Sequence, residues 1–289
     1  MPLEFANIVP ENNLRLPDAL TIKYGPAPLL ARFVLEGDKA VRQMGIRLRL
    51  RHDFDDLVYI NKQLVSEGLW YPLINMFDPE YTDLLPENAY WLSGEDEDGN
   101  IVMTWAARVF NWPDTTLEDN VGIMLCEKKD RPRSCQVSSA AARALRQING
   151  VVFWGGSFWI HPDFRHRRLS PLIGRLGRAF AVSRWPVDWV MCLVEQKTVQ
   201  KGLVAGYGYR HISPAIYFPE SQFKNEVFAV YLSTAEAYED FAEFMTAELS
   251  EAEYDGSSAF ISGSRRLQTV TNISSEAVRH GNTSLSYVE

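Results

Sequence analysis

The chain has 289 residues, of which 46% are hydrophobic and 12% aromatic, so it can build the core of one large domain or two small ones. Its formal net charge of -8 argues against a general role in nucleic-acid binding, because an acidic surface repels a polyanion. No apolar run reaches the length of a membrane span and the first residues do not resemble a signal peptide, so we expect a cytoplasmic protein without a membrane partner.

Cysteine and histidine are few and scattered. Cys126, Cys135 and Cys192 form no C-x-x-C pair, and an odd number of cysteines without a secretory segment is typical of reduced thiols. Cys192 lies in an apolar strand, where we expect it in the core. The five histidines do not have the spacing of metal ligands, so the sequence predicts no metal site. P-loop, Rossmann and Gly-x-Ser-x-Gly motifs are also missing, which leaves kinase and hydrolase functions without support.

The N-terminal part predicts an extension, a strand and a helix. Residues 1–44 are expected to pack on the core as an extension. Residues 45–52 alternate apolar and arginine side chains, which is the pattern of a half-buried strand. Residues 53–68 then predict a helix that begins at Asp53 as its N-cap and stops at Gly68.

A predicted β-hairpin follows, between two long irregular segments. Its strands cover residues 89–93 and 101–109, on either side of an acidic turn. The segments 69–87 and 112–146 are inserts long enough to cover a substrate site. Five aromatic residues in them are candidates for an apolar acceptor pocket, with burial in the core as the alternative: Trp70, Tyr71, Phe77, Tyr81 and Trp112.

An apolar strand over residues 151–160 runs into a basic loop and then a helix. Apolar side chains at helical spacing start at Leu169, and we expect Ser170 to be the N-cap with Pro171 in the first turn. Unpaired N–H groups at the start of a helix attract anions, and the loop adds Arg165, His166, Arg167 and Arg168. The sequence therefore predicts a phosphate or pyrophosphate site at this loop.

The C-terminal part of the chain predicts one more strand, two helices and a pair of strands, followed by a tail. A buried strand is predicted over residues 189–194, a helix over 198–206, and a last helix over 234–249. A final pair of strands is expected between the last two helices. The resulting parts are the extension 1–44, a core domain over 45–249, and a Ser- and Thr-rich flexible tail over 250–289.

The string Ile160–Ser170, IHPDFRHRRLS, resembles the acetyl-CoA signature of the GNAT superfamily of N-acetyltransferases. In that family a strand ending in V-x-P-x-[YF] leads into R-G-x-G-[LI]-G and a helix. Arg165 and Leu169 match this pattern, whereas His166, Arg168 and Ser170 replace the three glycines. The similar order of elements extends over residues 45–232. It implies an α/β fold of the GNAT type, in which a mixed, strongly twisted sheet has helices on both faces.

The resemblance also implies a co-substrate, acetyl-CoA or another acyl-CoA, and no metal. In the family the loop holds the pyrophosphate, a role that here passes to Arg165, His166, Arg167, Arg168, Leu169 and Ser170. The family has a strand bulge that opens a gap for pantetheine, and the glycine pair 155–156 stands at the matching place. We therefore expect the backbone of Phe158 and Ile160 to pair with pantetheine. A bulge without a ligand is the alternative.

Two residues are candidates for proton transfer, which acyl transfer to an amine requires. Many family members use a tyrosine four residues before the glycine of a Gly-Phe pair. Residues 208–209, Gly-Tyr, resemble that pair, but Val204 stands at the position of the tyrosine. Tyr207 would serve if the helix were shifted, with a packed aromatic as the alternative. Glu195 is the candidate base, although it would equally cap the next helix or pair with Lys197.

Together these features predict a bacterial acyltransferase that moves an acetyl or short acyl group from coenzyme A to the amine of a small-molecule or peptide acceptor. Two alternatives stay open at this point. One is a longer acyl-CoA or an acyl carrier protein as donor. The other is a degenerate GNAT domain that senses acyl-CoA or acts as a binding scaffold without turnover. The sequence leaves the acceptor open among small amines, amino acids, antibiotics, peptide N-termini and protein lysines, and it is compatible with a homodimer.

Overall fold

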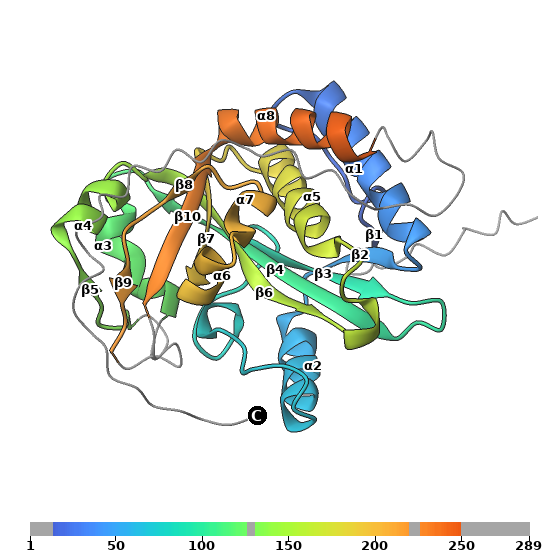
Figure 1. Ribbon diagram of the computed structural model, residues 1–289, viewed down its shortest axis with the longest axis horizontal. Coiled ribbons are helices and arrows are strands. Elements are labelled where there is room, and N and C mark those ends of the chain that lie inside the picture. Colours follow the sequence, from blue (N-terminus) through green and yellow to red (C-terminus); the bar gives the residue numbers. More distant parts are fainter. Residues whose placement is uncertain (1–13, 126–130, 220–225, 250–289) are drawn as a thin grey trace, which may run out of the picture. The chain divides into compact units, whose positions relative to one another are not determined.

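The computed structural model describes residues 14–125, 131–219 and 226–249 (Figure 1). The tail predicted over 250–289 and Cys126 lie outside these ranges. The proposed boundaries between extension, core and tail therefore stay predictions. Among the described residues, no helix is both long enough and apolar enough to cross a bilayer.

The strands of the described residues form one mixed sheet. Their order is β1-β2-β3-β4-β6-β7-β10-β9-β5, and β8 also pairs with β10. Every neighbouring pair is antiparallel except β6 and β7, which are parallel. The strands are β1 (Leu14–Arg15), β2 (Arg47–Arg51), β3 (Ala89–Glu95), β4 (Ile101–Trp112), β5 (Gln136–Val137), β6 (Gly150–Ile160), β7 (Trp189–Glu195), β8 (His211–Ile212), β9 (Ile216–Tyr217) and β10 (Val227–Ser233).

Helices cover both faces of the sheet (Figure 1). Those described are α1 (Ala27–Gln43), α2 (Phe54–Ser66), α3 (Leu117–Asn120), α4 (Ser139–Leu145), α5 (Leu169–Arg184), α6 (Gln196–Gln200), α7 (Leu203–Gly206) and α8 (Thr234–Phe244), which continues as a π-helical turn over Met245–Leu249. One apolar core packs α1, α5 and α8 against the sheet, through side chains such as Phe33, Leu176 and Phe241. A second core packs α2, α3 and α4 on the opposite face. This arrangement confirms the predicted fold class.

Local sequence explains the first elements. In β2, Leu48 and Leu50 are buried, whereas the arginines between them point to the other face, as the alternation predicted. The Asp53 carboxylate accepts hydrogen bonds from the backbone N–H groups of Asp55 and Asp56 and so caps α2. The predicted strand and helix are both confirmed.

The middle of the chain differs from expectation in length and continuity. The β-hairpin is confirmed, but β4 continues to Trp112 and is longer than predicted. The helix predicted over 198–206 is wrong as a single element, because α6 ends at Gln200 and α7 begins at Leu203. Gly202 between them has φ of 68°, a left-handed conformation that interrupts a right-handed helix.

Candidate functional site

The parallel strands β6 and β7 part halfway along their length. Their ladder has three pairs and ends at Trp154 and Met191, although β6 runs on to Ile160 and β7 to Glu195. Beyond that point β6 pairs with β4 and β7 pairs with β10. The facing edges of the two strands are therefore free of each other at their carboxyl ends.

A bulge in β6 accompanies this separation. Thr104 of β4 pairs with Trp159 and Ala106 with Gly156, so Ser157 and Phe158 lie opposite the single residue Trp105. Ser157 has φ of 49°, which is uncommon for a residue other than glycine and stores backbone strain. The bulge predicted from the glycine pair is thus confirmed, and its strained residue is the serine that follows the pair.

Two adjoining cavities lie along the second half of β6, the deep one between β6 and β7, and we call them together the groove. The deep cavity, of about 300 Å³, reaches from the strand edges to residues after α7; its walls include Tyr71, Ile74, Trp105, Trp154, Gly155, Ser157, Gly174, Arg178, Cys192, Glu195, Tyr207 and Tyr209. The outer cavity, of about 370 Å³, is lined by Leu69, Trp70, Tyr71, Phe158, Trp159, Ile160, Arg165 and Ser170. Tyr71, Phe158 and Ser170 line both, so one groove leads from the basic loop into the protein.

The basic loop has an unusual backbone. His166 and Arg168 have φ of 64° and 57°, both in the left-handed region. These are two of the positions at which the resembling signature has glycine, so the loop adopts a glycine-like conformation with larger side chains. Left-handed backbone at such residues costs about 1–2 kcal/mol each relative to an unstrained conformation.

The start of α5 corrects one expectation. Arg168 is the N-cap and α5 begins at Leu169, so Ser170 is inside the first turn and is not the cap. Among the described residues, no side chain caps this end. The backbone N–H groups of Leu169 and Ser170 therefore stay available, whereas Pro171 has none to offer.

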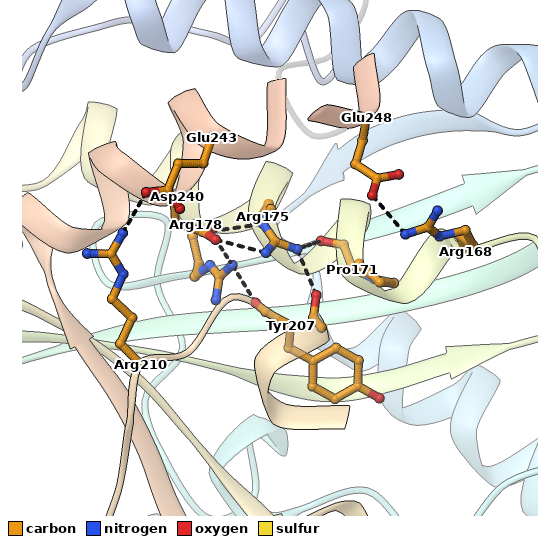
Figure 2. Close-up of polar contacts among 10 residues, drawn as sticks. Arg168, Pro171, Arg175, Arg178, Tyr207, Arg210, Asp240, Glu243 and Glu248 are labelled. Carbon is orange, nitrogen blue, oxygen red and sulfur yellow. Dashed lines mark hydrogen bonds and ion pairs between the residues drawn. The ribbon is translucent and has the colours of Figure 1, made fainter. Parts of the chain in front are cut away.

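The four basic side chains of the loop differ in what they contact. Arg165 donates Nε–H to the Ile160 carbonyl at 3.0 Å and lines the outer cavity. Arg167 is held by the carbonyl oxygens of Met44 and Asp163, at 3.0 and 2.9 Å. Arg168 pairs with Glu248 at 2.9 Å (Figure 2). His166 is exposed.

Glu248 compensates the charge of Arg168, whereas the carbonyl oxygens that hold Arg167 leave its charge uncompensated. The guanidinium that lines the groove is that of Arg165. Those of Arg167 and Arg168 already have acceptors within the protein.

Glu195 and Tyr207 both line the deep cavity, and the structure thus brings the two candidates for proton transfer together. The Glu195 carboxylate pairs with Lys197 Nζ at 2.5 Å, which was one of the alternatives. Burial raises the pKa of the Tyr207 hydroxyl, and the nearby Cys192 and Tyr71 add to this rise. Tyr207 therefore keeps its proton at neutral pH. Val204 is buried at 4% exposure in the α7 region and brings no titratable group to the groove.

A buried ion-pair network supports the segment that carries Tyr207 (Figure 2). Arg175 of α5 grips Asp240 of α8 with two hydrogen bonds of 2.9 and 2.8 Å. Arg175 also donates to the Gly206 carbonyl at 2.9 Å, and Arg178 donates to the Tyr207 carbonyl at 2.7 Å and to Asp240 at 3.3 Å. The network ties the end of α7 to two helices, while the Tyr207 ring points away from it.

Several groove residues were not anticipated from the sequence. Cys192 packs against the second core, as expected, and it also lines the deep cavity; burial raises the pKa of its thiol to about 11. Arg178 and Trp105 also line it, although α5 and β4 give only a core-packing signal in the sequence. Of the five aromatic candidates, Trp70 and Tyr71 line the groove. Phe77 and Trp112 pack in the second core, which was the alternative to a pocket role for these residues. Tyr81 is not among the residues that line the groove.

In the described part of the chain, no cluster of three or more His, Cys, Asp and Glu side chains has the arrangement of a metal site.

Comparison with known proteins finds no matching family model and no matching curated protein. Solved structures do match. FeeM, an N-acyl amino acid synthase from uncultured soil microbes, is 12% identical with a TM-score of 0.44, over 69% of this chain and 99% of that one. NAA60 from Arabidopsis thaliana in complex with acetyl-CoA is 10% identical with a TM-score of 0.40, over 66% and 99%.

The GNAT domain of S. lividans PAT is also similar, with 12% identity and a TM-score of 0.35, over 65% of this chain and 94% of that domain. Similarity at this level identifies neither activity nor substrate. The chain's own topology is the stronger observation: a twisted mixed sheet has helices on both faces, and its one parallel pair in the described ranges parts beside the basic loop. The described chain has an α/β fold of the GNAT type.

Proposed function

We propose that this protein is an acyltransferase that moves an acetyl or short acyl group from coenzyme A to an amine. The observation that carries the proposal is the groove between β6 and β7, which begins at the basic loop and ends at Glu195 and Tyr207. It offers, in order, a place for an anion, an unpaired strand edge, and titratable side chains. An acyl-CoA needs these three features in the same order.

The outer end of the groove suits a pyrophosphate. The N–H groups of Leu169 and Ser170 are uncapped at the positive end of the α5 dipole, and Arg165 adds a guanidinium beside them. The left-handed backbone at His166 and Arg168 supports this role, because it shapes the turn that leads into α5. Arg167 is not among the residues that line the groove, and two of its N–H groups are bonded to backbone carbonyl oxygens, so we assign the direct contact to Arg165.

The middle of the groove suits the pantetheine arm. In the described structure, β6 has no β7 partner after Trp154, and Phe158 and Ile160 line the groove along this edge. An extended chain with amide groups would pair with strand-edge groups that have no strand partner. The bulge lies at this point, and Trp105 of β4 packs closely against Gly155.

The deep end supplies the proton transfers. In the reaction the amine nitrogen forms a bond to the thioester carbon, and the carbon–sulfur bond breaks with its electron pair going to sulfur. Glu195 accepts the proton that the amine gives up, directly or through water. Tyr207 donates its hydroxyl proton to the departing sulfur; burial raises the pKa of this hydroxyl, so it is protonated at neutral pH.

Acyl-CoA binding without turnover is a second candidate function. It is favoured by the pairing of Glu195 with Lys197 and of Arg168 with Glu248, and by Val204 in place of the usual tyrosine. A longer acyl donor also stays open. Transfer of a short acyl group, binding without turnover and transfer from a longer acyl donor all use the same site. They differ in whether turnover occurs and in which acyl chain is preferred.

Arg165→Ala tests the proposal at the anion end. It is expected to weaken acetyl-CoA binding by about 10- to 100-fold, because a hydrogen bond to a charged group is lost. Arg143→Ala is the matched control, since Arg143 is an exposed arginine of α4 away from the groove. Titration calorimetry measures binding, and thiol release with a panel of amines and acyl-CoA chain lengths measures turnover. Equal binding by both variants would contradict the proposed site.

A further inference from the structure

Lys197 places an amine of the chain itself against the proposed base. Its Nζ atom lies 2.5 Å from Glu195 Oε2, and both residues line the deep cavity. Acyl transfer requires a contact of this kind between the acceptor amine and the base that takes its proton. The free protein therefore already presents an amine at Glu195.

The start of α6 explains this contact. Glu195 is the N-cap of α6, and Lys197 is the second residue of the helix. Side chains of a helix lean toward its N-terminus, so the Lys197 side chain points back toward the end of β7. Lys201, one turn further along, is the C-cap of the same helix and is not among the residues that line the groove. Of these two lysines, Lys197 alone reaches the groove.

The groups that acyl transfer needs are gathered around this amine. Tyr207, the proposed acid, lines the same cavity. The Tyr71 hydroxyl interacts electrostatically with Glu195 and Lys197, and it interacts with Tyr207 as well. The cavity measures about 300 Å³, at the small end of ligand pockets, and a lysine side chain has a flexible stem of four carbons. A thioester held between Glu195 and Tyr207 is therefore within reach of Nζ.

The exposure of the pair allows the amine to move. The Lys197 side chain is 71% exposed and that of Glu195 is 27% exposed, so Lys197 lies where the cavity meets solvent. Exposed ion pairs contribute little to stability. Lys197 can therefore turn from the carboxylate to a thioester without leaving a buried charge unpaired.

We propose that Lys197 is a site of self-acylation, at which the protein transfers an acyl group from its own bound coenzyme A thioester to Nζ. This inference rests on the proposed acyl transfer and adds a covalent modification to it. The product is an uncharged amide, so the modification also removes the ion-pair partner of Glu195.

The protons balance within the same cluster. Lys197 gives one proton of its ammonium group to the Glu195 carboxylate. The neutral Nζ then forms a bond to the thioester carbon, and the carbon–sulfur bond breaks with its electron pair going to sulfur. Sulfur receives the hydroxyl proton of Tyr207, which takes a proton from the nitrogen through water. The products are an acylated lysine, the thiol of coenzyme A, and one proton that Glu195 releases to water.

Incubation of the full chain with acetyl-CoA and no added amine tests the proposal. Peptide mass spectrometry follows the acetyl group on Lys197 and on Lys201, which is the matched control because it is an exposed lysine of the same helix. We expect Lys197 to be acetylated at least about tenfold faster, because the thioester is held beside it. Its rate should saturate with acetyl-CoA and fall when free coenzyme A is added. Equal rates at the two lysines, or a rate at Lys197 that does not saturate, would overturn the inference.

Glu195→Gln distinguishes catalysis in the site from uncatalysed reaction in solution, because the two predict opposite changes. The hydrogen bond to Glu195 raises the pKa of Lys197, so loss of the carboxylate leaves more neutral amine and an uncatalysed reaction becomes faster. We expect the reverse: acetylation of Lys197 slows by at least about tenfold, and that of Lys201 does not change. A faster or unchanged rate at Lys197 would refute the proposal.

Lys197→Arg keeps a positive charge beside Glu195 but removes the amine. The fast acetylation seen in the mass of the intact chain should disappear in this variant, and its persistence would refute the assignment to Lys197. Titration with acetyl-CoA and thiol release with added amines separate this inference from the proposed function. If acetyl-CoA binds and added amines release thiol while Lys197 stays unmodified, the inference alone fails. If acetyl-CoA does not bind, both fail.

Discussion

Substitution of Gly208 by alanine probes the ion-pair network that supports Tyr207. Gly208 has φ of 80°, and a Cβ atom there would lie 2.5 Å from Arg175 Nη2 and 2.5 Å from each carboxylate oxygen of Asp240. Real Cβ contacts are essentially never this short, so the buried ion pair must move. The substitution therefore combines a conformational cost with disruption of the pair.

The two contributions can be separated, because Gly202 offers a matched position. Gly202 has φ of 68°, and no atom lies within 4 Å of its added Cβ. Gly202→Ala should lower the free energy of unfolding by about 1–2 kcal/mol, the cost of a left-handed alanine. Gly208→Ala should lower it by about 3–5 kcal/mol, since breaking a buried ion pair is strongly destabilising.

Urea unfolding of the full chain measures both values. The double variant Gly208→Ala with Asp240→Ala adds a second readout: its destabilisation should be clearly less than the sum of the two single changes, because both disturb the same pair. Equal losses for Gly202→Ala and Gly208→Ala, or strict additivity with Asp240→Ala, would refute the network as we describe it.

Three further predictions concern individual groove and loop residues. The pKa of the Cys192 thiol is raised from 9.0 to about 11, so at pH 8 this thiol should contain about 100-fold less thiolate than a free cysteine. Iodoacetamide should therefore alkylate Cys192 about 100-fold more slowly than a free cysteine, measured in the double variant Cys126→Ser, Cys135→Ser. Alkylation at the rate of the urea-unfolded chain would show that the thiol is not buried as described. His166→Gly should raise the free energy of unfolding by about 0.5–1 kcal/mol, because relief of the left-handed strain exceeds the entropy cost of glycine, and a lowered urea midpoint would contradict it. Glu195→Gln should reduce thiol release by at least about tenfold at pH 7 while leaving acetyl-CoA affinity unchanged, and intact turnover would remove Glu195 as the base.

The features that could be predicted from the sequence were local ones. Alternation predicted β2, an Asp cap predicted the start of α2, and a glycine pair predicted the bulge in β6. Each depends on a few consecutive residues whose conformational preferences agree. The strand, the basic loop and the helix within residues 151–184 were also predicted from the preferences of consecutive residues.

Other features depend on contacts between distant segments. Arg178 and Asp240 are 62 residues apart, and no periodicity predicts that one carboxylate serves two arginines. The N-cap of α5 was predicted at Ser170 from propensity, but the structure has Arg168 in a left-handed conformation that propensity disfavours. Cys192 packs against the second core, as its apolar strand predicted, but its second role in the wall of the groove depends on the separation of β7 from β6.

Gly174 gives the most direct test of the groove as an acyl-CoA site. It lines the deep cavity from α5, and no atom lies within 4 Å of an added Cβ. Gly174→Leu should therefore place its Cβ without a clash and reduce the volume of the cavity, and it should stabilise α5 by up to about 1 kcal/mol because leucine favours a helix. Titration of the original chain with acetyl-CoA should give micromolar binding, and the variant should lose it while unfolding at equal or higher urea concentration. Undiminished binding in the folded variant, or no binding by the original chain, would contradict the account.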